Sequence, residues 1–153
     1  PAVSPDALEA AKRHRFAIVN VWRSVRSEPV EVLPLACCDA RSMDPEDLCV
    51  FEIHYADRVG ENYFAAHNDR HQWYYFPRME RHEAMLIKQW DSCGTLSGGQ
   101  KASFALHSAF VDPLAAEEAP DRESIEVRCL CIWPDNVEST EENAEGPAKR
   151  AKL

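Results

Sequence analysis

Short runs of β-branched and aromatic residues, separated by polar or proline-bearing turns, recur along most of this chain of 153 residues. Residues of these types favour strands, and a chain of this length buries a single core. The runs predict seven short strands, at residues 16–22, 30–38, 49–55, 71–77, 84–90, 103–110 and 122–133. One short helix is expected from Ser4 to about Arg13, because Pro5 stands at the first helical position. The pattern indicates a mainly β fold with minor helices, in which antiparallel strands form a sandwich or barrel.

The composition limits the classes of protein and partner that fit the chain. It is 45% hydrophobic and 28% charged, as in ordinary globular domains, and the formal net charge is −9. A negative field repels phosphate backbones, so nucleic acid is not an expected partner. No apolar stretch approaches the length that spans a bilayer, and the first residues lack the pattern of a secretory signal. We therefore expect no membrane partner and a cytoplasmic location.

Closely spaced reactive or charged residues have simple structural explanations. The six cysteines fall mostly in apolar runs, where they are expected to be reduced thiols. Cys129 and Cys131 are two apart on a predicted strand and point to one face, where packing is the simpler explanation and metal ligation the alternative. Lys88 and Asp91 are expected to form an internal ion pair.

The chemical character of the chain changes at Pro134. Residues 1–133 are expected to form one β-rich domain. Residues 134–153 have no aromatic side chain and too little apolar surface to offset the entropy of ordering, so a disordered tail is expected, first acidic and then basic. Its last seven residues, PAKRAKL, fit either a nuclear-import signal, which would add a nuclear location, or a solubilising charged end.

The two faces of the predicted strand at 122–133 differ in chemistry. Alternation places one group on a face expected to pack in the core: Ile125, Val127, Cys129, Cys131 and Trp133. The opposite face begins with Arg122, Ser124, Glu126 and Arg128. A buried guanidinium needs an anionic partner. Two arginines beside a hydroxyl are what a pocket for a ligand carboxylate requires.

His107 stands fifteen residues before Arg122, on the preceding predicted strand. Antiparallel strands would bring the imidazole and the guanidinium onto one sheet. A neutral imidazole can bind iron and a fixed cation can bind a carboxylate. A histidine followed by Arg-x-Ser is the order found in iron(II)/2-oxoglutarate oxygenases, whereas a structural histidine in a packed sheet is the alternative.

Six segments between about Arg15 and Trp133 carry a family resemblance. They read RFAIVNVWRSV, PLACCDARSM, HQWYYFPRM, EAMLIKQWDS, LHSAFVDP and RESIEVR. Together they resemble the fungal hydroxylase/desaturase family of iron(II)/2-oxoglutarate oxygenases, which includes gibberellin desaturase-like and cephamycin methoxylase-like enzymes. The resemblance implies a partial double-stranded β-helix, or jelly roll, corresponding to the C-terminal half of the family fold. It also implies hydroxylation or desaturation of a small-molecule secondary metabolite.

The resemblance assigns roles to several side chains. His107 would be an iron ligand, and Arg122 with Ser124 would bind 2-oxoglutarate. Arg128, on the same predicted face, is a second candidate for the carboxylate or the substrate. Asn20 would line the pocket if its strand faces that way.

The rest of the iron site is expected to lie outside this chain. Family members carry an H-x-D ligand pair ahead of the NVWR segment, and the internal His67-Asn68-Asp69 falls at a loop that the family does not use for iron. Iron held by His107 alone would be weakly bound, so the isolated chain is expected to be inactive. A missing N-terminal half is a possible partner. The alternative function is a non-catalytic truncated paralogue that acts as a binding or interaction module.

Overall fold

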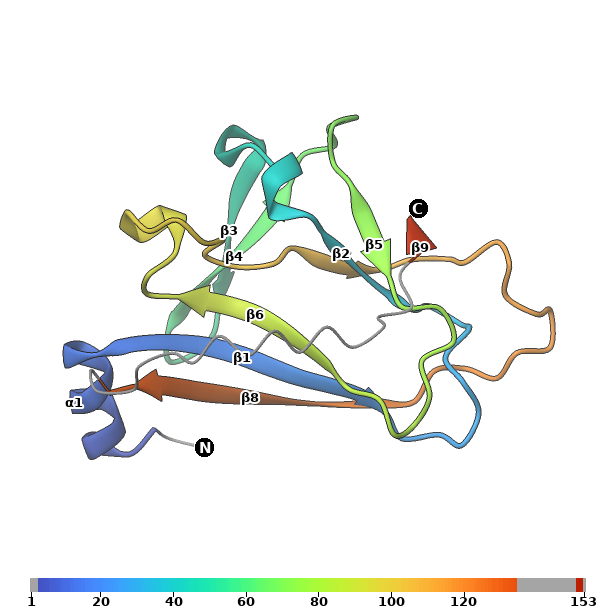
Figure 1. Ribbon diagram of the computed structural model, residues 1–153, viewed down its shortest axis with the longest axis horizontal. Helices are drawn as coiled ribbons and strands as arrows, with labels where there is room; N and C mark the ends of the chain where they lie inside the picture. The colour runs from blue at the N-terminus through green and yellow to red at the C-terminus, as the bar shows by residue number, and fades with distance from the viewer. Residues whose placement is uncertain (1–2, 135–150, 153) are drawn as a thin grey trace.

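The described part of the chain forms antiparallel sheets preceded by one short helix (Figure 1). The structure is a computed structural model that describes residues 3–134 and 151–152. Its helix and strands are α1 (Pro5–Arg13), β1 (Arg15–Ser24), β2 (Leu35–Cys38), β3 (Leu48–His54), β4 (Val59–Ala65), β5 (Trp73–Tyr75), β6 (Met85–Asp91), β7 (His107–Ala109), β8 (Ser124–Trp133) and β9 (Ala151–Lys152). Single 3-10 turns lie at Ala40–Ser42, Pro45–Asp47 and Thr95–Ser97.

The described strands pair into three sheets. One has the order β6-β1-β8, the second has the order β7-β2-β5-β9, and β3 and β4 form a hairpin. Every pairing between these strands is antiparallel. The predicted class, mainly β with antiparallel sheets and a minor helix, is confirmed. No helix among the described residues is long and apolar enough to cross a bilayer.

The helix forms where the sequence predicts it. Ser4 caps the N-terminus, since its hydroxyl accepts a hydrogen bond from the backbone N–H of Ala7 at 3.2 Å. Pro5 occupies the first turn, where its missing N–H costs nothing. Lys12 and Arg13 stand in the last turn, next to the negative end of the helix dipole.

The main core lies between the three-stranded sheet and β2. Its buried members are Trp22, Val30, Met79, Met85 and Ile87, with Leu35, Cys37 and Phe76 packed against them. Trp22 pairs with Met85 across β1 and β6, so the inner side of this sheet faces β2. Burial of apolar area at this interface is the main force that holds the two sheets together.

A buried carboxylate joins the ends of β1 and β6. Asp91 is fully buried and accepts hydrogen bonds from Arg15 Nη2 at 2.8 Å and Lys88 Nζ at 3.2 Å. The Arg15 hydrogen bonds, with further donation from the Cys93 backbone N–H and Lys88, hold the pKa of Asp91 well below its usual range. The expected ion pair of Lys88 and Asp91 is therefore confirmed.

The pairing of β1 with β6 contains one irregularity. Ile18 pairs with Trp90 and Val19 pairs with Lys88, so Gln89 has no partner on β1. This is the arrangement of a β-bulge, in which one strand carries an extra residue.

The observed strands differ from the predicted ones: several are shorter than expected, and one was not predicted. The strand expected at 30–38 covers only Leu35–Cys38, because Leu33 adopts a left-handed φ of 50° and Pro34 has no N–H to donate. The strand expected at 103–110 covers only His107–Ala109. The strand β4, which includes Gly60 and polar residues, was not predicted.

The expectation that one face of β8 packs in the core is wrong for its first half. Ile125 and Val127 are 50% and 54% exposed. They lie on the side of the sheet opposite Trp22, whose partner on β8 is Glu126, and the main core lies on the Trp22 side. Cys129 and Cys131 are half-buried free thiols.

The predicted tail falls largely outside the described residues. Residues 135–150 and 153 are not described, and Ala151–Lys152 form β9 beside β5. The disordered tail at 134–153 and the role of PAKRAKL stay predictions.

Candidate functional site

A cavity of about 480 Å³ lies where β1 and β8 meet β4, β6 and the segment that leads into β7. Side chains that line it include Asn20, Lys88, Gln89, His107, Glu126 and Arg128. We call it the His107 cavity. It joins a histidine, charged groups of both signs and three amides, those of Asn20, Asn62 and Gln89, in one concave site, which is the usual composition of a small-molecule site.

Asn20 positions the two charged residues of β8. Its side chain is 2% exposed, and it pairs with Arg128 across β1 and β8. The Asn20 Nδ2 group donates to Glu126 Oε1, and its Oδ1 accepts from Arg128 Nε at 3.1 Å. An amide has one donating and one accepting end, so it orients both neighbours at once.

The outer end of the Arg128 guanidinium remains available to a ligand. Only its Nε makes a hydrogen bond within the part of the chain that the structure describes. The two Nη groups can therefore donate to a carboxylate in the forked geometry that makes such bonds strong.

His107 begins β7 and pairs with Cys37 of β2. Its Nδ1 lies 3.0 Å from the carbonyl oxygen of Ala105. A carbonyl only accepts hydrogen bonds, so Nδ1 carries the proton in the neutral ring and Nε2 keeps its lone pair. Backbone support of one ring nitrogen is typical of histidines that ligate metals through the other. The imidazole therefore fits one position of an iron site.

Gln89 presents a buried donor without a partner. Its Nε2 has no hydrogen-bond acceptor among the described residues, although its side chain lines the His107 cavity. A buried unpaired donor is costly, and a ligand oxygen would remove that cost. Gln89 owes this position to the bulge, which no sequence pattern indicates.

Arg122 and Ser124 lie away from the cavity lining. Arg122 precedes β8, its Nη1 donates to the Leu33 carbonyl, and its guanidinium stacks 5.7 Å from the ring centre of Trp22. Ser124 is exposed at the start of β8. The expectation that His107 and Arg122 lie on neighbouring strands is wrong, because β7 and β8 belong to different sheets and Arg122 precedes its strand.

The described residues contain no group of three or more His, Cys, Asp or Glu side chains arranged to hold a metal ion. His67 Nε2 lies 3.7 Å from Asp69 Oδ1, and both side chains are exposed. Neither lines the His107 cavity.

The sequence has close counterparts. Residues 2–132 match the family profile described as an oxidoreductase/YMDC permease-like domain. The chain is 36% identical over 132 residues to aspirochlorine biosynthesis protein N of Aspergillus oryzae, covering 84% of this chain and 53% of that protein. It is also 36% identical over 144 residues to the hydroxylase/desaturase asaB of Aspergillus flavus, covering 84% of this chain and 61% of the relative.

The fold also has a solved counterpart. The iron and alpha-ketoglutarate-dependent endoperoxidase NvfI superposes with a TM-score of 0.72 at 32% identity, covering 84% of this chain and 46% of that one. This match confirms the expected jelly-roll architecture. The chain spans about half the length of the relatives it matches.

Proposed function

The chain belongs to the oxidoreductase/YMDC permease-like family, and from that premise we propose that it forms part of an iron(II)/2-oxoglutarate-dependent hydroxylase or desaturase. The observation that carries the proposal is that Arg128 and His107 line the same cavity. Iron(II) with 2-oxoglutarate would supply oxidation of an unactivated C–H bond in a small-molecule substrate. Relatives named as dioxygenases or hydroxylase/desaturases support this class of chemistry.

Arg128 would hold a carboxylate of 2-oxoglutarate. Its two Nη groups have no partner among the described residues, and the buried Asn20 amide fixes its Nε. Gln89 would donate a further hydrogen bond to an oxygen in the same cavity. Arg122, which the motif assigns to this role together with Ser124, instead donates to the Leu33 carbonyl and stacks on Trp22, so we assign the carboxylate to Arg128.

His107 would bind the iron through Nε2. The Ala105 carbonyl keeps the proton on Nδ1 and so keeps the ligating nitrogen unprotonated. The remaining iron ligands are not assigned to residues of this chain.

Anaerobic calorimetry with 2-oxoglutarate tests the carboxylate site. Arg128→Ala should weaken binding between about tenfold and a hundredfold, because charge-assisted hydrogen bonds to a carboxylate are lost. The affinity of Arg128→Lys should lie between those of the wild type and Arg128→Ala, since lysine keeps the charge but cannot form the forked pair of hydrogen bonds. Arg122→Ala is the matched control and should leave the affinity unchanged.

Two results would count against the proposal. If 2-oxoglutarate does not bind the wild-type chain, the co-substrate assignment fails. If Arg122→Ala weakens binding more than Arg128→Ala, and both variants keep the wild-type melting temperature, the carboxylate belongs to Arg122. Because only one iron ligand is assigned to this chain, binding without succinate formation in the presence of iron(II) and ascorbate is the expected result, and it does not by itself favour a non-catalytic binding module.

The partner is a small-molecule substrate, and the net charge of −9 argues against nucleic acid. A cytoplasmic location is proposed, with nuclear entry through PAKRAKL as the alternative. Imaging of a fluorescent fusion with and without residues 147–153 distinguishes the two locations.

A further inference from the structure

A second cavity lies next to the His107 cavity. It measures about 220 Å³ and is lined chiefly by apolar side chains, among them Met43, Leu48, Leu96 and Phe104. We call it the Met43 pocket. The side chains of Met43, Leu48 and Phe104 are half-buried, whereas Leu96 stands exposed at the rim.

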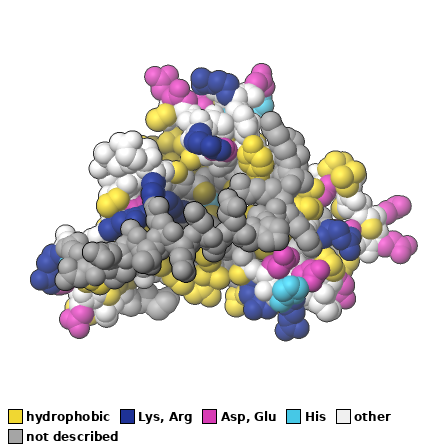
Figure 2. All heavy atoms as spheres, viewed as in Figure 1, with side chains coloured by type: hydrophobic (Ala, Val, Ile, Leu, Met, Phe, Trp, Pro, Cys, Tyr) yellow, Lys and Arg dark blue, Asp and Glu magenta, His cyan; other side chains and the backbone are white. Residues whose placement is uncertain are grey.

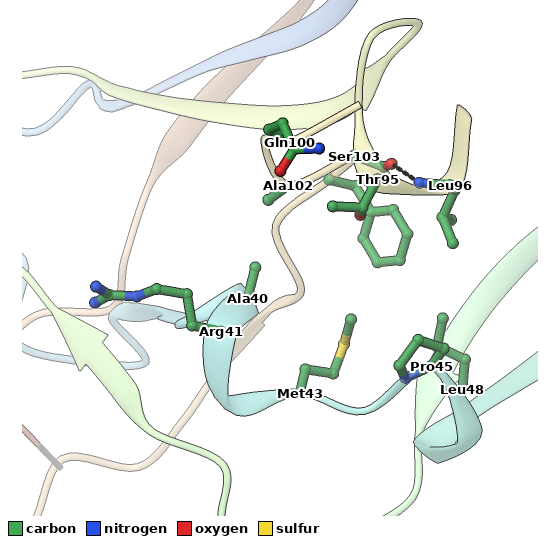
Figure 3. Close-up of a pocket in the computed structure, with 11 residues that line it drawn as sticks. Ala40, Arg41, Met43, Pro45, Leu48, Thr95, Leu96, Gln100, Ala102 and Ser103 are labelled. Carbon is green, nitrogen blue, oxygen red and sulfur yellow. Dashed lines mark hydrogen bonds between the residues drawn. The ribbon is translucent and has the colours of Figure 1, made fainter. Parts of the chain in front are cut away.

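The pocket is built by two segments that are far apart in the sequence. Figure 3 shows Met43 and Leu48 on one side, facing Thr95 and Leu96 on the other. Met43 lies between β2 and β3 and Leu48 begins β3, whereas Thr95 and Leu96 lie in the turn after β6. Arg41 also lines the pocket, but its guanidinium points away from it in Figure 3 and binds the Asp39 carboxylate at 2.6 Å.

Phe104 is a common wall of the two cavities. It lines both of them and stands three residues before His107. The Tyr63 ring stacks on Phe104 with a centroid distance of 5.5 Å and an interplanar angle of 5°. Tyr63 also lines the His107 cavity, so an aromatic pair stands between that cavity and the Met43 pocket.

The lining selects an uncharged, apolar ligand group. The Ser103 hydroxyl already accepts a hydrogen bond from the Leu96 backbone N–H at 2.9 Å, whereas the exposed Gln100 amide can still bind a ligand oxygen. A dry apolar cavity of about 150 Å³ accommodates benzene. The Met43 pocket therefore has room for one ring, or for a branched aliphatic group of similar size.

We propose that the Met43 pocket binds the apolar part of the substrate, while the carbon that reacts lies on the His107 side of Phe104. This inference rests on the proposed function. It makes Phe104 and Leu96 determinants of substrate choice and places the substrate in the class of molecules with a hydrophobic ring or branched chain.

Methyl NMR on the chain labelled at its methionine methyl groups tests the pocket directly, with toluene as the probe. The chain has three methionines, and Met79 and Met85 lie in the main core, away from the pocket. Toluene should shift the Met43 methyl resonance in a saturable way and leave Met79 and Met85 unchanged. Saturating 2-oxoglutarate should not displace toluene, because the co-substrate would bind on the opposite side of Phe104.

A pair of tryptophan variants supplies the control. Leu96→Trp should fill the rim and weaken toluene binding about tenfold or more. Leu114→Trp adds the same side chain at a position that is 84% exposed and outside the pocket, and it should leave binding unchanged.

The remaining outcomes separate this inference from the proposed function. Equal shifts of all three methyl groups, no shift of Met43, or displacement of toluene by 2-oxoglutarate would overturn the inference alone. A selective Met43 shift in a chain that does not bind 2-oxoglutarate would overturn the proposed function, and with it the assignment of the pocket to a substrate.

Discussion

The strands β1 and β3 are both rich in β-branched and aromatic residues, yet their surroundings differ. β1 lies between β6 and β8 and has four buried residues, whereas β3 pairs only with β4 and has none. Val50, Phe51 and Phe64 of the hairpin are each at least 47% exposed. Residue type alone therefore does not decide burial, because burial depends on which element packs against the strand. The next four predictions test this contrast.

The largest contrast should come from large-to-small substitutions. Ile87 is 1% exposed in the core that faces β2, so Ile87→Ala should lower the free energy of unfolding by about 2–5 kcal/mol. Val50→Ala, at a site that is 62% exposed in the hairpin, should change it by less than about 0.5 kcal/mol. Urea unfolding measures both, and equal losses would show that the two regions do not differ in packing.

The next largest loss of stability is expected when the charge of a buried carboxylate is removed. Asp91→Asn keeps the acceptor for the Cys93 N–H but removes the charge that Arg15 and Lys88 need. We expect a loss of about 2–3 kcal/mol, at the lower end for a buried pair because both cations are partly exposed. Asp57→Asn in the exposed hairpin turn, where Asp57 pairs with Arg58, is the control and should be nearly neutral. A neutral Asp91→Asn would mean that the buried charge gives no net stability.

The same carboxylate should make stability depend on pH. The folded-state pKa of Asp91 lies below its unfolded value of about 3.9, so its contribution is present above that pH and is lost as the pH falls toward the folded pKa. Asp47, whose pKa is lowered by hydrogen bonds from Asn68 and His71, acts in the same direction. The difference in unfolding free energy between wild type and Asp91→Asn should therefore shrink below about pH 4. Chemical denaturation between pH 7 and pH 3 measures it, and a constant difference would contradict the assignment.

The smallest effect is expected within the hairpin itself. Phe51 and Phe64 form an edge-to-face contact with ring centroids 5.2 Å apart. Phe64→Ala should cost only about 0.5–1 kcal/mol, because both rings remain largely exposed in the wild type. Hydrogen exchange should show faster opening of β3 and β4 with no change in β1. Faster exchange in β1 as well would show that the two regions unfold as one unit.

Much of the backbone could be predicted where local chemistry decides it. Ser4 and Pro5 specify the helix start, and the apolar run at β1 gives a strand within two residues of its observed ends. The order of the motifs indicated the family. The alternation of β8 also placed Glu126 and Arg128 on one side, where they line the cavity.

The remaining features depend on contacts between distant residues. The left-handed conformation of Leu33 delays the start of β2, and no turn motif marks it. Arg122 precedes β8, so extending the strand alternation to it gave the wrong neighbour for His107. The exposure of Ile125 could not be read from its residue type, because the core lies on the opposite side of the sheet.

Because β6 carries one extra residue, its positions should differ in how well they tolerate a deletion. Ile18 pairs with Trp90 and Val19 with Lys88, so removing Gln89 would leave a regular ladder with each remaining side chain on its present side. Removing a residue between Met85 and Ile87 would instead turn part of the strand to the opposite side, and removing Lys88 would take away a cation that pairs with Asp91. A viable one-residue gap in β6 should therefore fall at 89, and a homologue that carries it would keep the sheet while losing the amide that donates into the His107 cavity.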